Sequence, residues 1–334
     1  MISVWAPDGV GEVRRGDDLA DHLLEALPGS AVSTGSTDEG RLADGDIVCV
    51  TSKVVSKAEG RTVVGDRASA IVAETRRLVA RRGPLQVVVN RLGLTMAAAG
   101  VDASNVAPGT VLLLPEDPDA TARALRATIA TRAGANVAVL VTDTAGRAWR
   151  EGQTDLAIGA AGLQVLDDHV GRVDPYGNTL AVTAPAVADE IAGAAELAAG
   201  KLGRRPFAVL RGRPDLVLAP GDDGPGAVAL LRPEGADLFG LGSREAVLAA
   251  LAADDAARPA FGSPADAEDL RDVLTSLLGP SGVVVRLDEQ GDRALLVTTD
   301  DPRALWAADV AAYAHGWHTE SHDASGVRLR PITP

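Results

Sequence analysis

The sequence is short of positive charge and has a single cysteine, and each shortage excludes a class of protein. A formal net charge of −14 at pH 7 argues against nonspecific binding to nucleic acid or to an anionic membrane, because such polyanions attract an excess of lysine and arginine. Cys49 is the one cysteine, so it cannot form an intrachain disulfide. Because Cys49 lies in an apolar run, we expect a buried thiol and a reducing compartment.

Long hydrophobic runs are also missing from the chain. No stretch of about 18 apolar residues occurs, and the first residues lack a basic segment followed by an apolar one, so neither a membrane helix nor a secretion signal is predicted. With 334 residues the chain is long enough for two or three domains and a large core. We therefore expect a soluble, cytoplasmic protein without a nucleic-acid or membrane partner.

The most informative stretch runs from Asn136 to Gly162. An apolar run over residues 137–141 shows no alternation and predicts a strand buried on both faces, which Asp143 and Thr144 follow. The carboxyl edge of such a strand is where α/β folds place chemistry, and a carboxylate beside a hydroxyl suits Mg²⁺ or Mn²⁺. A strand followed by an ordinary Asx turn fits the same residues equally well.

Two further polar clusters follow other apolar or small-residue runs. Ser52, Lys53 and Lys57 follow a second buried strand, in what we interpret as a turn, and hydroxyls with lysines suit an oligophosphate. The glycine spacing of a Walker A loop is absent, and exposed lysines in a turn are common. A later loop holds Asp102, a candidate metal ligand, and Asn105, a candidate nucleotide contact, although an Asx turn is favoured for this loop alone.

Hydrophobic periodicity and turn residues predict an α+β chain, because strands and helices do not alternate strictly. A Gly-Pro pair at 83–84 is interpreted as the end of one helix, and Asp155, Asp174 and Asp189 as caps or turn residues. Composition divides the chain into a domain at 1–245, a linker at 246–264 and a small α+β domain of unknown role at 265–334. Helices are predicted over residues 19–27, 68–82, 118–132, 243–252, 266–278 and 302–315, and strands over 2–6, 47–50, 85–89, 111–114, 137–141, 207–210, 227–231, 282–288, 294–299 and 327–330.

Several long blocks of sequence occur in one uninterrupted order. They read GDD, TSKVVSKAEG, AGVDASNV with LLPEDPD, VTDTAGRAWREGQTDLAIGAAG, DDHVGRVDPYGNTLAVTAPAVADE and AAELAAGKLG. In order and spacing they resemble the coenzyme F420 gamma-glutamyl ligase family over about residues 2–245. The resemblance implies a mixed-sheet gamma-glutamyl ligase fold in an intertwined homodimer. Residues 265–334 are too few for the nitroreductase-like domain that follows in some members.

The resemblance also implies an activity and its co-substrates. It implies GTP-dependent ligation of L-glutamate to the deazaflavin precursor coenzyme F420-0 through an acyl phosphate, with further gamma-linked glutamates as an extension. The implied cofactors are Mg²⁺ or Mn²⁺, with K⁺ as a further candidate. Preference for GTP over ATP rests wholly on the resemblance, because no NKxD-type guanine motif is present.

Individual residues take roles from the same resemblance. Asp102, Asp143 and Thr144 correspond to metal ligands. Arg147 joins the two aspartates as a catalytic candidate that holds the glutamate or the precursor's phosphodiester, the alternative being that it only balances nearby carboxylates. At Lys201 some members are expected to have glutamine, so a phosphate contact is expected here in place of a metal ligand. The implied nucleotide contacts are Val10, Gly11, Glu12, Val13, Ser52, Lys53, Lys57, Asn105, Gly200 and Lys201.

Two other classes of function remain open from the sequence. Another Mg²⁺- and nucleotide-dependent ligase or kinase would use the same site but ignore the deazaflavin. A noncatalytic assembly subunit is supported only by the unusual C-terminal region. The presence of Asp102, Asp143 and Thr144 argues against a noncatalytic subunit, because a degenerate relative would be free to lose them.

Overall fold

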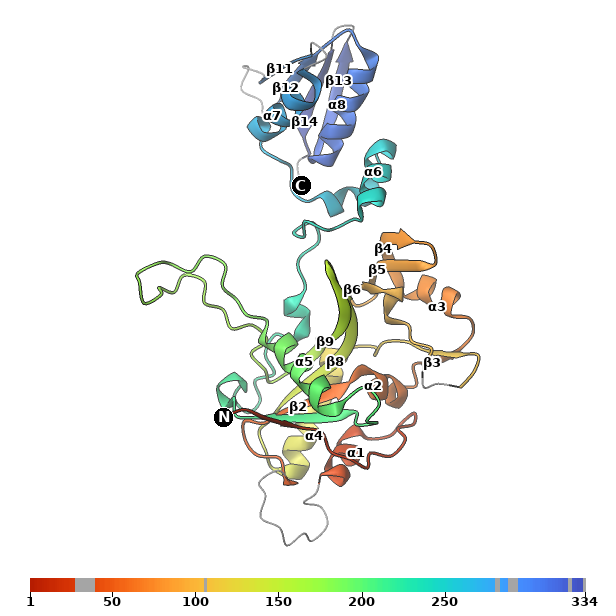
Figure 1. The fold of residues 1–334 in the computed structure, drawn as a ribbon, viewed down its shortest axis with the longest axis vertical. Helices are drawn as coiled ribbons and strands as arrows, with labels where there is room; N and C mark the ends of the chain where they lie inside the picture. The colour runs from red at the N-terminus through yellow and green to blue at the C-terminus, as the bar shows by residue number, and fades with distance from the viewer. Residues whose placement is uncertain (28–39, 105–106, 280–282, 288–293, 324–325, 333–334) are drawn as a thin grey trace. The chain divides into compact units, whose positions relative to one another are not determined.

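The computed structural model describes residues 1–27, 40–104, 107–279, 283–287, 294–323 and 326–332 (Figure 1). The predicted helix stop at Gly29, the candidate Asn105 and the predicted turn at 289–292 lie outside these residues. The architecture is α+β, as predicted. Contacts separate the chain into two compact units, residues 1–77 with 87–231 and residues 78–86 with 232–334. In the described residues, no helix is both long and apolar enough to cross a membrane.

The first unit is built on a mixed five-stranded sheet in the order β1-β10-β2-β8-β9. The neighbours β2 and β8 run parallel, and the other neighbouring pairs are antiparallel. In the parallel pair, Thr51, the last residue of β2, lies beside Thr142 in the middle of β8, and the parallel pairing ends there. The bounds are Ser3–Trp5 for β1, Ile47–Thr51 for β2, Ala138–Arg147 for β8, Arg150–Ala161 for β9 and Phe207–Arg211 for β10.

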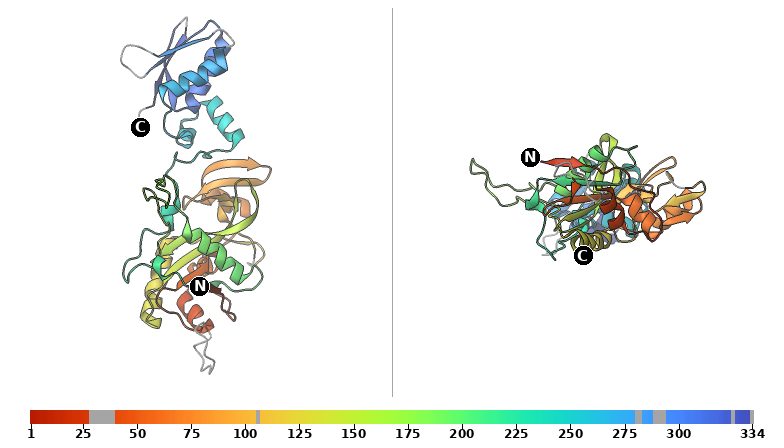
Figure 2. Two further views of the ribbon diagram at one scale, coloured as in Figure 1. Left: turned by 60° about the vertical axis from the view of Figure 1, so that its left-hand side comes forward. Right: turned by 90° about the horizontal axis from the view of Figure 1, so that it is seen from below.

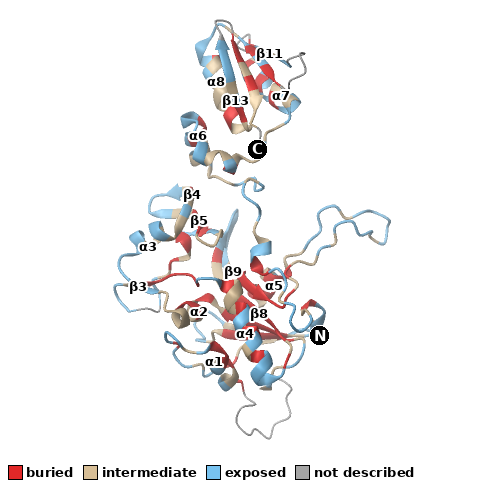
Figure 3. Cartoon of the chain, turned by 180° about the vertical axis from the view of Figure 1, so that it is seen from behind, coloured by how far each residue is buried: buried red, intermediate tan, exposed pale blue. Residues whose placement is uncertain are grey.

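The ribbon of β8 and β9 separates two apolar cores, because alternate side chains of a strand point to opposite faces. Val139 and Val141 pack in a core that includes residues of α1, α2 and α4, whereas Ala138 and Leu140 pack in one that includes residues of α5. Figure 3 shows the ribbon largely in the colour of buried residues. The helix bounds are Leu19–Ala26 for α1, Ser52–Glu59 for α2, Pro118–Ala133 for α4 and Val187–Ala199 for α5.

The helix predicted over residues 68–82 is wrong in its second half. Helix α3 (Arg67–Glu74) ends early, and the chain continues as β4 (Thr75–Arg82), which pairs with β5 (Leu85–Asn90). Gly83 has a φ of 57°, and a positive φ is what a two-residue hairpin turn of type II′ requires at its first central position. The Gly-Pro pair that resembles a helix stop is therefore a hairpin turn.

Two shorter segments also differ from prediction. Ser52 to Lys57 belong to helix α2, which follows β2 directly, and do not form a turn. Residues 227–231, predicted as a strand, contain the 3₁₀-helix η4 (Ala227–Leu230). The Asp119 carboxylate accepts hydrogen bonds from the amides of Ala227 and Val228, and this contact fixes the start of the 3₁₀ turn. Short elements of the unit are β3 (Thr62–Val64), β6 (Thr95–Ala97), η2 (Ala98–Gly100), β7 (Thr110–Leu112) and η3 (Pro214–Leu216).

The second unit contains a four-stranded antiparallel sheet in the order β11-β12-β14-β13. Residues of α7 and α8 share its core with Trp317, whose side chain is buried and donates to the Ala265 carbonyl. Strand β13 has no predicted counterpart, because beyond Trp317 its residues are mostly polar and it lies at a sheet edge. The bounds are Ser243–Ala252 for α6, Asp255–Phe261 for η5, Ala267–Leu278 for α7, Val284–Leu287 for β11, Leu295–Thr298 for β12, Pro302–Ala314 for α8, Trp317–Asp323 for β13 and Gly326–Pro331 for β14.

One buried arginine of α4 joins distant segments of the first unit. Arg126 is 4% exposed, and its guanidinium donates hydrogen bonds to several segments of the chain. The acceptors of Arg126 are the carbonyls of Val137, Leu218, Ala219 and Asp222 and the side chains of Asn136 and Asp223. Gly162 lies so close to Arg126 that a side chain at position 162 would collide with the guanidinium.

Arg126→Lys should lower the free energy of unfolding by about 3 kcal/mol or more, because an ammonium cannot satisfy so many buried acceptors. Chemical denaturation measures this loss. Arg123→Lys, an exposed position of the same helix, is the matched control and should change stability by less than about 0.5 kcal/mol. Equal effects of the two substitutions would contradict a structural role specific to Arg126.

Candidate functional site

The polar cluster of the first unit lies where β2 ends and its parallel pairing with β8 stops. Thr51 of β2 and Thr142 of β8 are register partners. Ser52 follows the first as the opening residue of α2, whereas Asp143 follows the second inside β8, which continues to Arg147. The prediction that Asp143 and Thr144 lie beyond the end of the strand is therefore wrong, because pairing with β9 extends β8 past them. Open α/β sheets bind ligands where parallel strands end, and the end of the β2–β8 pairing is the corresponding place here, so we take it as the candidate site.

Asp143 is a half-buried carboxylate whose negative charge is poorly compensated. Its Oδ1 accepts a hydrogen bond from the Ser52 hydroxyl at 2.7 Å. Burial, opposed by this hydrogen bond and reinforced by the negative charges of Asp155 and Asp102, raises the pKa of Asp143 to about 6. A cation beside Asp143 would relieve both the burial penalty and the repulsion.

Asp102 lies on the same side of the ribbon, held by residues of α2 and its own loop. Lys53 Nζ lies 2.6 Å from Asp102 Oδ2 and 2.9 Å from Ser104 Oγ, and the Ser104 amide donates to Asp102 Oδ1 at 2.7 Å. Burial disfavours the ionised carboxylate, but the hydrogen bonds from Lys53 and Ser104 outweigh it, so the pKa of Asp102 is lowered. Ser52 and Lys53 thus connect Asp143 and Asp102 through adjacent residues of one helix.

A second cluster occupies the opposite face of the ribbon. Thr144 Oγ1 donates to Asp155 Oδ1 at 2.6 Å, and Thr142 Oγ1 donates to Asp155 Oδ2 at 3.2 Å. Lys201, which follows α5, donates from Nζ to Thr144 Oγ1 at 2.6 Å. Because Asp143 and Thr144 are consecutive in a strand, their side chains point to opposite faces and define two positions.

Asp155 is the residue of this cluster that the sequence interpretation missed. It is 5% exposed and lies inside β9, so the prediction of a cap or turn residue is wrong. Pairing of Thr144 with Asp155 in the β8–β9 register brings the two together. Recognition of residues 138–161 as a hairpin would have revealed the contact.

The predicted turn role of Asp174 is confirmed, since it accepts from the amides of Tyr176 and Asn178.

The donor set of the Asp143 face fits a divalent cation that also binds water or phosphate. Among the described residues, no three His, Cys, Asp or Glu side chains are grouped closely enough to hold a metal ion. Mg²⁺ commonly takes one or two carboxylates and completes its shell with waters and substrate phosphates. The half-buried charge of Asp143, with Asp102 nearby, matches that mode of binding.

Other predicted residues lie outside the two clusters. Arg147 is exposed near the hairpin end, opposite Arg150, where its Nη2 donates to the Glu151 carbonyl at 3.3 Å. Lys57 lies one helical turn after Lys53, and its ammonium has no polar partner in the part of the chain that is described.

The N-terminal loop and the end of α5 supply the remaining candidates. Val13 is buried in the core of the Asp143 face and Val10 packs against it, whereas Gly11 and Glu12 are exposed. The loop meets the last turn of α2, where the Gly16 amide donates to the Ala58 carbonyl. Gly200 caps the end of α5 directly before Lys201.

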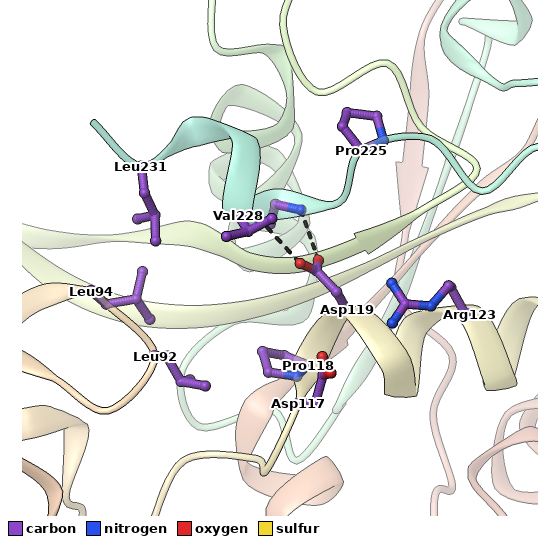
Figure 4. A pocket seen from close by; sticks show the side chains of 10 residues that line it. Leu92, Leu94, Asp117, Pro118, Asp119, Arg123, Pro225, Val228 and Leu231 are labelled. Carbon is purple, nitrogen blue, oxygen red and sulfur yellow. Dashed lines mark hydrogen bonds between the residues drawn. The ribbon is translucent and has the colours of Figure 1, made fainter. Parts of the chain in front are cut away.

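A cavity of about 340 Å³ lies elsewhere in the first unit, beside the start of α4 (Figure 4). None of the predicted site residues lines it. Its carboxylates have structural partners, since Asp117 caps α4 and Asp119 accepts from the amides of Ala160, Ala227 and Val228. We therefore place the chemistry where β2 ends beside the middle of β8.

Comparison with known proteins identifies the class to which this fold and site belong. The sequence matches the family described as F420-0:Gamma-glutamyl ligase over residues 9–70 and 63–212. Coenzyme F420:L-glutamate ligase of Methanopyrus kandleri is 36% identical over 250 residues, which cover 68% of this chain and 93% of the relative. That of Methanothermobacter thermautotrophicus is 35% identical over 259 residues, covering 71% and 98%. That of Archaeoglobus fulgidus is 38% identical over 231 residues, covering 63% and 88%.

These matches make the chain a ligase that forms carbon–nitrogen bonds. It belongs to the F420-0:gamma-glutamyl ligase family. The family resemblance of the sequence blocks is thereby confirmed. The family match ends at residue 212, so residues 232–334 of the second unit lie beyond it.

Asp143→Asn should stabilise the metal-free protein while keeping the acceptor for Ser52. The pKa of Asp143 is raised from 3.8 to about 6 in the folded protein. The folded state therefore binds the carboxyl proton of Asp143 more tightly than the unfolded state does. As pH rises from about 4 to 6, ionisation of Asp143 lowers the free energy of unfolding. The variant should gain up to about 3 kcal/mol near pH 8 and almost nothing near pH 4, as measured by chemical denaturation.

Asp102→Asn provides the matched control with the opposite sign. The pKa of Asp102 is lowered in the folded protein, so its ionised form stabilises the fold, and the substitution should destabilise the protein near pH 8. A loss of stability in both variants would show that the Asp143 charge is better compensated than its surroundings indicate.

Proposed function

We propose that this chain uses GTP to ligate L-glutamate to coenzyme F420-0, with release of GDP and phosphate. The observation that carries the proposal is that a half-buried, poorly compensated Asp143 lies with Asp102 and Lys53 where the parallel pairing of β2 and β8 ends. Membership of the ligase family supports the substrates. We also propose that the reaction takes place in the cytoplasm.

The proposed chemistry has two displacement steps. A carboxylate oxygen of the precursor attacks the γ-phosphorus of GTP, and the bond to the GDP oxygen breaks, which leaves an acyl phosphate. The amine nitrogen of glutamate then attacks the acyl carbon and loses a proton, while the carbon–oxygen bond to phosphate breaks. Both steps depend mainly on positioning and on compensation of phosphate charge, so no protein nucleophile is required.

Helix α2 supplies positive charge for this chemistry. Lys53 and Lys57 are four residues apart in the helix and therefore lie on one side of it. Mg²⁺ or Mn²⁺ held by Asp102 and Asp143 would add positive charge at the phosphates. If Asp102 held the metal, the Lys53 ammonium, now paired with Asp102, would be available for phosphate oxygens. K⁺ is a further candidate cation.

The exposed end of the β8–β9 hairpin is suited to binding anionic substrate groups. Arg147 and Arg150 are register partners there and are both exposed. Guanidinium groups bind carboxylates and phosphates through paired hydrogen bonds. We assign Arg147 to the glutamate carboxylate or the precursor's phosphodiester.

Purified protein incubated with coenzyme F420-0, L-glutamate, GTP and Mn²⁺ should give products heavier by whole glutamate residues in mass spectrometry. Asp143→Asn should abolish the product, since the variant keeps the hydrogen bond from Ser52 but loses the charge that binds metal. Replacement of GTP by ATP tests the base preference. Phosphate release without a heavier deazaflavin would favour a different nucleotide-dependent enzyme, and nucleotide binding without turnover would favour a noncatalytic subunit.

We also propose that the protein is a homodimer, because an arm of the first unit exposes apolar side chains. Residues 167–185 form a long loop that leaves the body of the unit and returns to it (Figures 1 and 2). We call it the arm. Backbone hydrogen bonds join Asp167 to Pro185 and His169 to Thr183, and Asp174 closes the tip. A second copy of the chain would bury the exposed apolar residues, which are Val170, Val173, Tyr176 and Val182 at 53%, 62%, 91% and 88% exposure.

Val173→Asp with Val182→Asp should convert the dimer to monomer in sedimentation experiments, because each substitution would bury a charge in the contact. Val72→Asp is the matched control, as Val72 is 70% exposed on α3 and outside the arm. It should leave the sedimenting mass unchanged. A wild type that sediments as monomer at all concentrations would contradict the dimer.

A further inference from the structure

Lys201 places an ammonium group on the Thr144 face of the ribbon. Its Nζ lies 2.6 Å from Thr144 Oγ1 and 3.6 Å from Glu196 Oε1. The side chain is 64% exposed, so it reaches the ribbon from the surface. It is held there by the hydroxyl of a strand residue and by a carboxylate of α5.

The hydrogen-bond directions around Asp155 show why this position attracts positive charge. Thr142 and Thr144 both donate their hydroxyl protons to the Asp155 carboxylate. The lone pairs of the hydroxyl oxygens are therefore left to accept, and Thr144 uses one for the Lys201 ammonium. Two hydroxyls and a carboxylate form a set of hard oxygen ligands of the kind that small cations bind.

Asp155 needs the positive charge because it is buried. Its carboxylate is 5% exposed and forms no direct ion pair with any residue that the structure describes. Thr144 relays the charge of Lys201 to it through two hydrogen bonds of 2.6 Å. A buried carboxylate with only neutral donors is costly, and the relay reduces that cost.

We infer that Lys201 acts as a built-in cation that excludes a second metal ion from the Thr142, Thr144 and Asp155 cluster. A metal ion on Thr144 Oγ1 would lie beside the ammonium that now contacts the same oxygen, and the two positive charges would repel each other. The chain therefore takes one divalent ion, on the Asp143 face, and supplies the other positive charge itself. The position on the Asp143 face rests on the proposed function.

The number of Mn²⁺ ions bound per chain tests this inference. Free Mn²⁺ is followed by electron paramagnetic resonance during titration of the full chain with a non-hydrolysable GTP analogue. Lys201→Gln should bind one more ion per chain than wild type, because it removes the ammonium and offers an amide oxygen. Lys201→Arg keeps the positive charge and should bind the same number as wild type.

The added ion should depend on Asp155, so the double variant Lys201→Gln with Asp155→Asn should return to the wild-type number. An unchanged count in Lys201→Gln, or an added ion that persists in the double variant, would overturn the inference. Asp143→Asn separates this result from the proposed function, because it should remove the ion of the opposite face in wild type and in Lys201→Gln alike. Retention of that ion would refute the Asp143 assignment and leave the conclusion on Lys201 intact.

Discussion

The partial burial of the Asp143 carboxylate, next to the apolar first half of β8, is the constraint on which the site depends. Val139 and Val141 precede it on the same face and are buried in the core, so that side of the strand offers the charge no polar partner. Ser52 gives one hydrogen bond, while neighbouring carboxylates increase the repulsion. The folded chain thus carries an unfavourable charge that a cation would neutralise, and it keeps this charge at a cost in stability.

The pleat of β8 divides the polar residues into two groups with different partners. Asp143 faces the core that contains α2 and α4, and Thr144 faces the core that contains α5. One strand therefore presents oxygen ligands to two separate regions of the same edge. Lys53 serves the first group and Lys201 the second, so each face has an ammonium in hydrogen-bonding contact with its oxygens.

Sequence patterns predicted the parts of this fold whose signals are local. The buried strand over residues 137–141 and the helix that starts after Asp117 are confirmed, because an unbroken apolar run and a capped run are properties of short segments. The predicted end of the strand is wrong, since β8 continues through Asp143 and Thr144 to Arg147, where its partner is β9. The helix predicted over residues 68–82 failed where pairing with β5 overrode local helical preference after Glu74. Lys201 could be proposed for phosphate but not for Thr144, since that contact joins segments far apart in sequence.

The same limit explains why Asp155 was misassigned. A carboxylate followed by an apolar run resembles a turn or cap when the partner strand is unknown. Only the register of β8 with β9 shows that Asp155 lies across from Thr144. The family resemblance, by contrast, rests on the order of several long blocks along the chain, which requires no knowledge of contacts.

Side-chain hydrogen bonds hold helix α2 in place at both of its ends. Its first residue holds Asp143, while Glu59 in its last turn accepts from the Glu116 amide and the Thr121 hydroxyl. The backbone of the helix is thus ordered before any ligand arrives. The entropy lost on binding then falls mainly on the two lysine side chains, at about 0.5–1.5 kcal/mol each, and little of the binding energy is consumed in moving the helix.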